Sequence, residues 1–384
     1  MYPYGLTPGR NATWLRIELR FQIRRHVGKF TEGKPMQSVQ QTGAWRGHNR
    51  YSRDFLKLDV VKQVQVLVDE LANFHLHKHK KLSNATVMAR AYVCHQFLDT
   101  VRQAGFAIRN ILNIDQRHIG AAVSAWVADG LAASTIQTRM SILRWLAAAV
   151  GKKGLIMDPS YYGVEDATVA RTYVATEDKS WSAHDVISAE KVAEAMAIDV
   201  WVGHQLDLMR AFGLRINESI MLRPEIADQG NMLRIEEGTK GGRTRNVPIR
   251  TEDQRRVIDA AKLLATRSAR GSMCPPSLKV AQAKNRIYYV AGKRLGLRKA
   301  DLGVTPHGLR HEYANDRYEE VSGSPSAVRG GSSILDRAAD ERARHQVTHD
   351  LGHARLSITA AYTGPRIKGR PRKQPPPAQT EPGA

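Results

Sequence analysis

The side chains best suited to chemistry gather in residues 305–362 of the 384-residue chain. His307 and Arg310 are spaced so that they fall on one side of a helix, and His353 lies nine residues before Tyr362. An Arg side chain can bind two phosphate oxygens, a His exchanges a proton near neutral pH, and a Tyr can act as a covalent nucleophile. This stretch therefore indicates nucleophilic attack on a nucleic-acid phosphate.

Arg215 offers a positive charge for the same phosphate. It follows Gly213-Leu inside an apolar helical stretch, where a buried guanidinium is costly unless an anion or a carboxylate meets it. Glu218, three residues further on, can orient this guanidinium. An internal Arg–Glu pair without a ligand is the alternative.

A second set of cations follows. Two short alternating runs around a Gly-Gly turn predict a β-hairpin with Lys240 at its tip. Such a lysine is usually solvated, but Arg243 and Arg245 beside it make a basic finger that suits a phosphate or a groove edge. We therefore expect Arg243 and Arg245 to bind DNA.

The charge of the whole chain favours a polyanion as partner. The sequence has 58 Lys and Arg against 37 Asp and Glu, for a net charge of +21, and 42% of its residues are hydrophobic, as in a globular protein. DNA, RNA or an anionic membrane surface fits this charge, and a merely basic protein is the alternative. A membrane is disfavoured because there is no run of about 18 apolar residues and no signal-peptide core. Two cysteines, Cys94 and Cys274, exclude a disulfide scaffold and a Cys-rich zinc site and fit a cytoplasmic protein.

The helical period predicts a four-helix bundle over residues 56–152, after a basic arm at 1–55. The first helix extends to Phe74; Asn84 precedes the second, and Asp115 and Ser134 cap the third and fourth. The arm touches phosphates or is a solvated leader. In the fourth helix, Arg139 and Arg144 are candidates for contacts along a DNA backbone, with solvated surface as the alternative.

The segment His75-Leu-His-Lys-His79 invites a metal interpretation. We place it at the end of the first helix, where residues two apart diverge by roughly 200°. No carboxylate cluster stands nearby to complete a coordination shell. The sequence therefore predicts a cationic helix end and no metal.

The rest of the chain is expected to form a linker at 153–185, a catalytic domain at 186–365 and a basic, Pro-rich tail at 366–384. The catalytic domain combines helices with the small hairpin. The predicted fold is thus mainly α with a small β-sheet, a helical bundle joined to an α+β domain.

Four motifs, in this order, resemble the tyrosine recombinase, or phage integrase, family. They are Gly213-Leu-Arg-Ile-Asn-Glu, Thr239-Lys-Gly-Gly, His307-Gly-Leu-Arg-His, and Leu351-Gly-His followed by Tyr362. Each motif is weak alone, whereas the ordered set over residues 190–365 is specific. The bundle resembles the SAM-like core-binding domain of the family by architecture only.

The resemblance implies a role for each candidate. Tyr362 attacks a scissile DNA phosphate to form a 3′-phosphotyrosyl bond, and Arg215 and Arg310 stabilise the transition state. Lys240 protonates the leaving 5′ oxygen as general acid. His307 assists proton transfer at the tyrosine or hydrogen-bonds the phosphate, and His353 donates a further hydrogen bond to the phosphate. No metal and no other cofactor is implied.

One feature departs from the family. Arg310 and His353 are 43 residues apart, which is longer than usual. We interpret residues 321–333 as an inserted surface loop that leaves both flanking helices intact. His311 is expected to be structural.

The resemblance also implies partners. We expect double-stranded DNA at specific attachment sites, a homotetramer on DNA, and accessory directionality or DNA-bending proteins, in the cytoplasm at the bacterial nucleoid. The expected function is site-specific integration or excision of a mobile element. A nicking-closing enzyme like type IB topoisomerases and a noncatalytic DNA-binding regulator are the alternatives.

Overall fold

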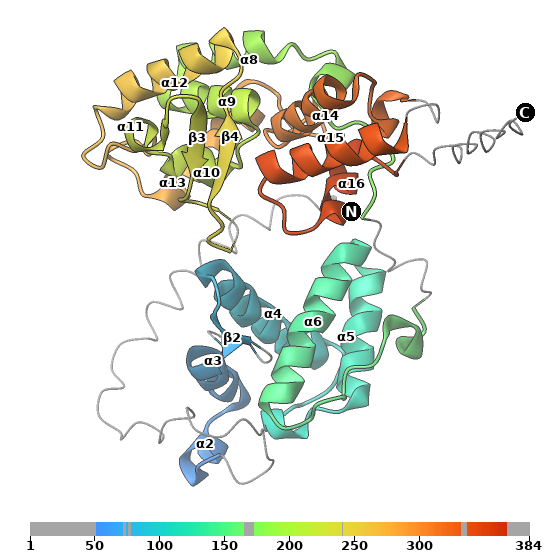
Figure 1. Cartoon of the computed structure of the whole chain (residues 1–384). Coiled ribbons are helices and arrows are strands. Elements are labelled where there is room, and N and C mark those ends of the chain that lie inside the picture. Colours follow the sequence, from blue (N-terminus) through green and yellow to red (C-terminus); the bar gives the residue numbers. More distant parts are fainter. Residues whose placement is uncertain are drawn as a thin grey trace, which may run out of the picture. The chain divides into compact units, whose positions relative to one another are not determined.

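The computed structural model describes residues 51–71, 74–75, 78–164, 173–239, 241–331 and 336–366. Most of the predicted arm, Lys240 and nearly all of the tail lie outside the described residues. The chain divides into two compact units, 1–171 and 172–384 (Figure 1). The predicted fold class is confirmed, because both units are mainly helical and the only β-structure in the described ranges is two short hairpins.

The first unit contains the predicted bundle. Its helices are α2 (Arg53–Lys57), α3 (Val60–Leu71), α4 (Asn84–Gln103), α5 (Gln116–Ala128) and α6 (Ala133–Ala149). Their apolar faces meet in one core around Leu67, Phe97 and Trp126. Asp115 caps α5 as predicted, since its side chain accepts from the backbone N–H of Arg117. Ser134 instead lies inside α6, which begins one residue earlier.

The His-rich segment is not a helix end. The first helix stops at Leu71, and β1 (Phe74–His75) pairs antiparallel with β2 (Lys78–Lys81). The alternation of apolar and basic residues from Phe74 onward fits the period of a strand, which the sequence interpretation overlooked. Among the described residues, no group of three His, Cys, Asp or Glu side chains is placed to hold a metal ion.

The predicted linker is shorter than expected. Ile156 and Val164 are buried in the core of the first unit, and the 3₁₀ helix η2 (Pro159–Tyr162) lies between them. Trp181 is buried in the core of the second unit, and its indole N–H donates to the carbonyl of Thr305 at 2.7 Å. The described ends of the segment 153–185 therefore belong to the two folded units.

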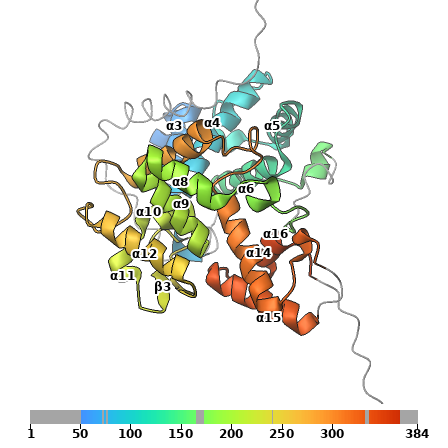
Figure 2. The ribbon, with the colours of Figure 1, turned by 90° about the horizontal axis from the view of Figure 1, so that it is seen from above.

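The second unit is built around α9 (Val200–Phe212), whose side chains are buried on most of its faces. The helix contacts α8 (Ser188–Ile198), α12 (Glu252–Ala265) and α14 (Gly308–Ser322), as Figures 1 and 2 show. Two short helices follow α9, namely α10 (Ile216–Met221) and α11 (Pro224–Ala227). Next comes the predicted hairpin, in which β3 (Met232–Ile235) pairs with β4 (Arg245–Pro248).

The remaining helices carry the C-terminal motifs. They are α13 (Val280–Tyr289), continued by the π-helix η4 (Val290–Arg294), then α15 (Arg337–Asp350) and α16 (Ala360–Thr363). The helices on both sides of the predicted insertion, α14 and α15, are intact and pack side by side (Figure 2). α14 contacts α16, and α15 contacts the turn before it, so two helices flank the segment that carries Tyr362.

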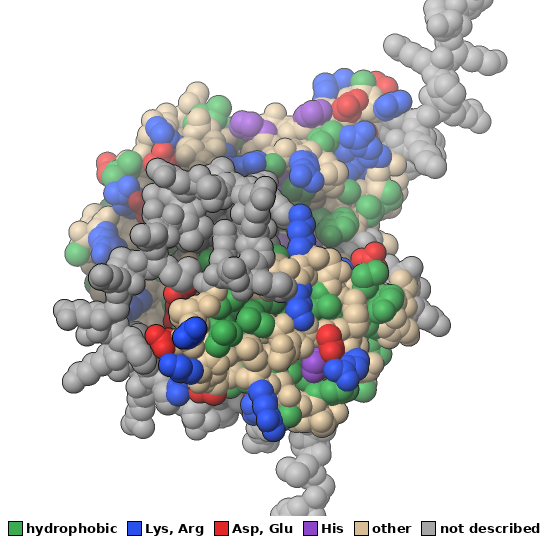
Figure 3. Space-filling model, turned by 90° about the horizontal axis from the view of Figure 1, so that it is seen from below, with side chains coloured by type: hydrophobic (Ala, Val, Ile, Leu, Met, Phe, Trp, Pro, Cys, Tyr) green, Lys and Arg blue, Asp and Glu red, His purple; other side chains and the backbone are tan. Residues whose placement is uncertain are grey.

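The described surface shows two further properties. No helix within it combines the length and the apolar character needed to cross a bilayer. On the face drawn in Figure 3, Lys and Arg side chains occur in separate groups among acidic and apolar side chains. The positive charge is therefore not gathered into one patch on that face.

Candidate active site

A buried carboxylate, Glu218, forms the floor of the site. Glu218, on α10, is fully buried and accepts two hydrogen bonds from the guanidinium of Arg245, at 3.0 and 2.8 Å. It also accepts from the side chain of Arg215 at 2.6 Å and from the backbone N–H of the same residue at 2.8 Å. Burial alone raises the pKa of Glu218, but Arg245, then Arg310 and Arg215, outweigh it and lower the pKa to about 2. The predicted orientation of Arg215 by Glu218 is confirmed.

Arg310 joins three segments that are far apart in the sequence. It is fully buried on the first turn of α14, and its Nη1 donates to the carbonyl of Gly213. Its Nη2 donates to the carbonyl of Leu351 at 2.7 Å and lies 3.4 Å from Nε2 of His353. Burial lowers the pKa of Arg310 to about 10, so the guanidinium keeps its charge at neutral pH.

Tyr362 lies against this guanidinium. Nε of Arg310 donates to its phenol oxygen at 3.3 Å. The Tyr362 ring is 4.6 Å from the ring of His311, 5.3 Å from that of His353 and 6.1 Å from that of His307, centroid to centroid. Only 7% of Tyr362 is exposed. The two C-terminal motifs therefore converge on one phenol.

The surrounding imidazoles are neutral at physiological pH. Burial, followed by the positive charge of Arg310 and Arg215, lowers the pKa of His353 to about 3. Burial and the neighbouring His307 lower the pKa of His311 to about 3. His307 keeps part of its surface exposed, and burial of the rest, followed by the charge of Arg310, lowers its pKa. Neutral rings can accept a proton or donate a hydrogen bond to a phosphate.

Arg245 corrects one prediction. We expected it to bind DNA, but it is 6% exposed, and its Nε donates to the carbonyl of Asp350 at 2.8 Å while its terminal nitrogens hold Glu218. The strand alternates, so Arg245 and Val247 share the buried face of β4. The period of two in the sequence was the signal that placed Arg245 inside. Arg243, by contrast, is exposed, as a DNA contact requires.

The turn that carries His353 depends on Gly352. This glycine has a φ of +65°, and a Cβ added to it would lie 2.7 Å from Cδ of Arg245. Only glycine adopts this conformation at little cost and also leaves room for the arginine. The backbone N–H of His353 then donates to the carbonyl of Thr348 at 2.9 Å, which fixes the start of the next segment.

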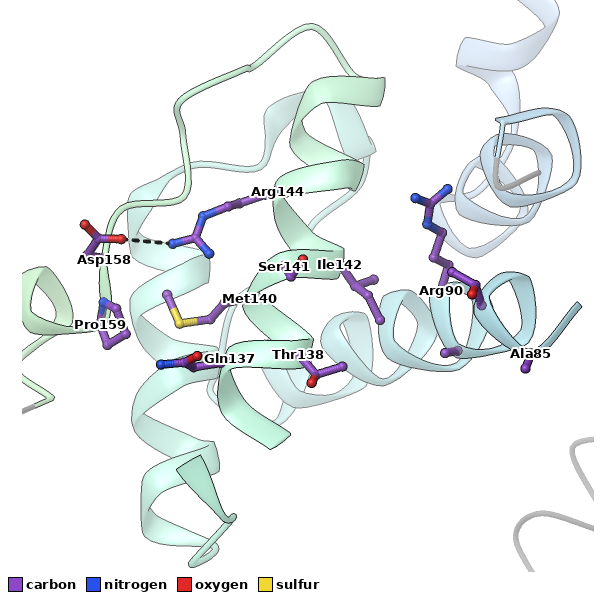
Figure 4. Close-up of a pocket in the computed structure, with 12 residues that line it drawn as sticks. Ala85, Arg90, Gln137, Thr138, Met140, Ser141, Ile142, Arg144, Asp158 and Pro159 are labelled. Atoms are coloured by element: carbon purple, nitrogen blue, oxygen red, sulfur yellow. Dashed lines mark hydrogen bonds and ion pairs between the residues drawn. The ribbon is translucent and has the colours of Figure 1, made fainter. Parts of the chain in front are cut away.

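The two predicted DNA-binding arginines of the first unit lie on α6. Arg139 is half-buried, with its guanidinium 5.1 Å from the centre of the Trp126 ring. Arg144 is exposed and donates to the carbonyl of Met157 and to the carboxylate of Asp158. Arg144 borders a surface groove of about 700 Å³ between α4 and α6, as Figure 4 shows.

Comparison with known proteins matches both units. A family model described as "Integrase" matches residues 172–316, and one described as "Phage integrase, N-terminal" matches residues 65–156. The tyrosine recombinase XerC of Mesorhizobium japonicum is 26% identical over 310 residues, which cover 75% of this chain and 88% of the relative. The tyrosine recombinase XerA of Pyrococcus horikoshii is 29% identical over 162 residues, which cover 41% of this chain and 47% of the relative.

A solved structure shares the fold. A lambda integrase fragment, in a structure of a dimer bound to a COC′ core site, has a TM-score of 0.52 at 15% identity, over 83% of this chain and 99% of that chain. Together with the family models and the curated relatives, this shows that the chain belongs to the tyrosine recombinase family. The integrase match contains four of the six candidate catalytic residues of this recombinase, Arg215, Lys240, His307 and Arg310, whereas His353 and Tyr362 lie beyond it.

The structure of this recombinase brings five of the six candidate catalytic residues into one site, and the sixth, Lys240, lies outside the described residues. The set of catalytic candidates lacked two groups that belong to the site. One is the buried Arg245, and the other is His311, whose ring packs against the ring of Tyr362. His311 directly follows Arg310, but its contact with Tyr362 joins residues 51 positions apart, so no local pattern predicts it.

Proposed function

We propose that this recombinase cleaves and rejoins DNA at specific sites through a 3′-phosphotyrosyl intermediate on Tyr362, and that it integrates or excises a mobile element. The observation that carries the proposal is the 3.3 Å hydrogen bond from the buried guanidinium of Arg310 to the Tyr362 phenol. A cation at this place can bind a phosphate that the phenol attacks.

In the cleavage step, a bond forms between the Tyr362 oxygen and the phosphorus while the bond from phosphorus to the 5′ oxygen breaks. Arg310 and Arg215 stabilise the negative charge on the nonbridging oxygens. The side chain of Arg215 keeps 24% of its surface exposed, which leaves it accessible to a DNA phosphate. Rejoining reverses the step, so the energy of the broken bond is kept and ATP is not needed.

Two proton transfers complete the step. The phenol loses its proton to His307, a neutral and exposed imidazole 6.1 Å from the Tyr362 ring. The leaving 5′ oxygen gains a proton from Lys240, a role that rests on the family resemblance. His353 donates a further hydrogen bond to the phosphate. The guanidinium groups supply the positive charge, and we propose no metal.

DNA binding requires further contacts. We propose that the groove between α4 and α6, with Arg139 and Arg144, contacts the DNA backbone, and that Arg243 adds a contact from the hairpin. The similar lambda integrase structure is a dimer bound to a COC′ core site, which supports an assembly of several subunits. A homotetramer on double-stranded attachment sites, assisted by directionality or DNA-bending proteins, completes the proposal.

A nicked suicide duplex from the end of the element tests the function. After cleavage the short 5′ strand diffuses away, so a covalent protein–DNA adduct accumulates and is seen on a denaturing gel. We expect the adduct with wild type in EDTA, none with Tyr362→Phe, and a wild-type amount with Tyr161→Phe, an exposed tyrosine in η2.

Three results would contradict parts of the proposal. An adduct with Tyr362→Phe excludes Tyr362 as the nucleophile. Relaxation of supercoiled plasmids without a defined site favours a nicking-closing enzyme. Tight binding of the duplex by wild type without any adduct favours a DNA-binding regulator.

A further inference from the structure

The helix that carries Tyr362 is too short to fix the tyrosine by itself. α16 comprises Ala360–Thr363, about one turn, and an isolated helix of that length is unstable in water. Nevertheless Tyr362 and Thr363 are both buried. The position of the phenol must therefore be set by contacts with the rest of the catalytic unit.

Arg344 holds the C-terminal end of α16. This α15 residue is 1% exposed, and its Nη1 donates to Oγ1 of Thr363 at 2.9 Å and to the carbonyl of Gly364 at 3.2 Å. Its Nη2 donates to the carbonyl of Pro365 at 2.7 Å. Nε is bound to the buried carboxylate of Asp340 at 2.8 Å, which keeps the guanidinium in place. One side chain thus binds three acceptors at or just beyond the end of α16.

Asn315 contacts α16 from the other helix. It is fully buried on α14, and its Nδ2 donates to the carbonyl of His311 at 3.0 Å and lies 3.5 Å from the carbonyl of Tyr362. Its Oδ1 accepts from the hydroxyl of Ser326 at 2.6 Å. Ser326 belongs to the inserted segment, so the insertion supports the residue that contacts the tyrosine.

The insertion is anchored rather than free. Arg329 donates to Asp178 at 3.0 Å and to Asp316 at 2.6 Å. At Gly364, with a φ of +79°, an added Cβ would lie 2.9 Å from Val328, so the insertion also packs on the residue after α16. The interpretation as a surface loop is therefore incomplete, because the described part of the insertion, up to residue 331, buries Ser326 and contacts the nucleophile segment.

We infer that Asn315 and Arg344 are positioning residues, which fix Tyr362 in the active site of its own subunit before DNA binds. The described part of the insertion, residues 323–331, supports Asn315. The inference rests on the proposed role of Tyr362 as the nucleophile. Holding the phenol in place removes a large part of the entropy that attack would otherwise lose. Neither side chain touches the phosphate, so both act through α16.

The test compares Arg344→Lys and Asn315→Ala with wild type on the suicide duplex. We expect the rate of adduct formation at saturating DNA to fall at least about tenfold, since small misplacements of a reacting group have large effects. DNA affinity should stay within about twofold, because the cations that face DNA are unchanged. As a control, Arg210→Lys alters a different ion-paired arginine, one that is partly buried and does not contact α16, and should keep the wild-type rate.

If Arg344→Lys or Asn315→Ala does not fold, a milder variant still tests the inference. Ser326→Ala removes one hydrogen bond, to Oδ1 of Asn315, and no charge. We expect it to fold and to lower the adduct rate severalfold at a temperature well below its Tm. A wild-type rate for both Ser326→Ala and Arg344→Lys overturns the inference.

A mixing experiment tests the single-subunit arrangement. Tyr362→Phe keeps the arginines and Arg215→Ala keeps the tyrosine, so a mixture forms an adduct only if one subunit lends its tyrosine to another. We expect no adduct from the mixture, and an adduct at a rate near wild type overturns the inference. If wild type alone forms no adduct, the proposed function itself fails. If wild type forms the adduct and only the variants at Asn315, Ser326 and Arg344 behave otherwise than expected, the positioning roles alone fail.

Discussion

Nε of Arg310 donates to the phenol oxygen of Tyr362 at 3.3 Å, although 52 residues separate them in the chain. The other nitrogens of the same guanidinium hold the carbonyls of Gly213 and Leu351. Arg310 therefore has a structural role before any DNA is present, because it fastens the turn before Arg215 to the turn before His353. This double role leads to the first of four predictions.

Arg310→Lys should abolish most activity and also destabilise the protein. A lysine keeps the charge, but it lacks the planar fork that reaches two carbonyls and the phenol together. We expect adduct formation to fall at least about 100-fold, as for loss of a transition-state donor, with a lower Tm. The exposed pair of Arg298 with Asp301 offers the control, because Arg298→Lys should leave both unchanged. Equal activity of Arg310→Lys and wild type would contradict the role of Arg310.

Glu218→Gln should cost about 3–5 kcal/mol in the free energy of unfolding, since it leaves buried guanidinium groups without their counter-charge. The measurement is urea unfolding at pH 7. A double variant with Arg245→Met should recover part of this loss, because it removes one of the uncompensated charges. A loss below about 1 kcal/mol in Glu218→Gln would show that the carboxylate does not balance these arginines.

Glu312 should make the protein less stable as pH rises. Burial, followed by the nearby Asp316, raises the pKa of Glu312 from an ordinary value of 4.5 to about 7. A raised pKa means that the folded state favours the protonated acid, so this contribution is complete below pH 4.5 and is lost as pH rises through about 7. Glu312→Gln should therefore have a higher Tm than wild type at pH 8 and a similar one at pH 4.5. An unchanged difference in Tm across this range would contradict the prediction.

Gly352→Ala should lower both stability and adduct formation. Its positive φ strains any other residue by about 1–2 kcal/mol, and the added methyl group also collides with Arg245. Gly271→Ala separates the two effects, because Gly271 has a φ of +60° and nothing within 4 Å of an added Cβ. We expect a larger loss of Tm at Gly352 than at Gly271, and a loss of activity at Gly352 alone. Equal losses of Tm and of activity at both positions would show that backbone strain alone, and not the collision with Arg245, explains the effect of Gly352→Ala.

Local patterns predicted much of the fold. The helical period and the capping residue Asp115 predicted the bundle, and the turn glycines predicted the β3–β4 hairpin. The motif order predicted which residues meet, because Arg215, Arg310, His353 and Tyr362 lie in one site. The assigned roles of these residues stay predictions.

The errors have a common physical origin in nonlocal contacts. Arg329 and Asp178 are 151 residues apart, so nothing near the insertion indicated that it is anchored. Arg245 appeared to be a surface cation because its partner Glu218 lies on another element. The hairpin at His75 differs, since its alternation was present in the sequence but was outweighed by the helical period before it.

The backbone N–H of Ala175 donates to the carbonyl of Ala360 at 2.8 Å, at the first residue of α16. Residue 175 lies only a few positions after the point where the chain passes from the first unit into the second. The start of the second unit is thus joined directly to the first residue of the helix that carries Tyr362, so a displacement of residue 175 would act on that helix.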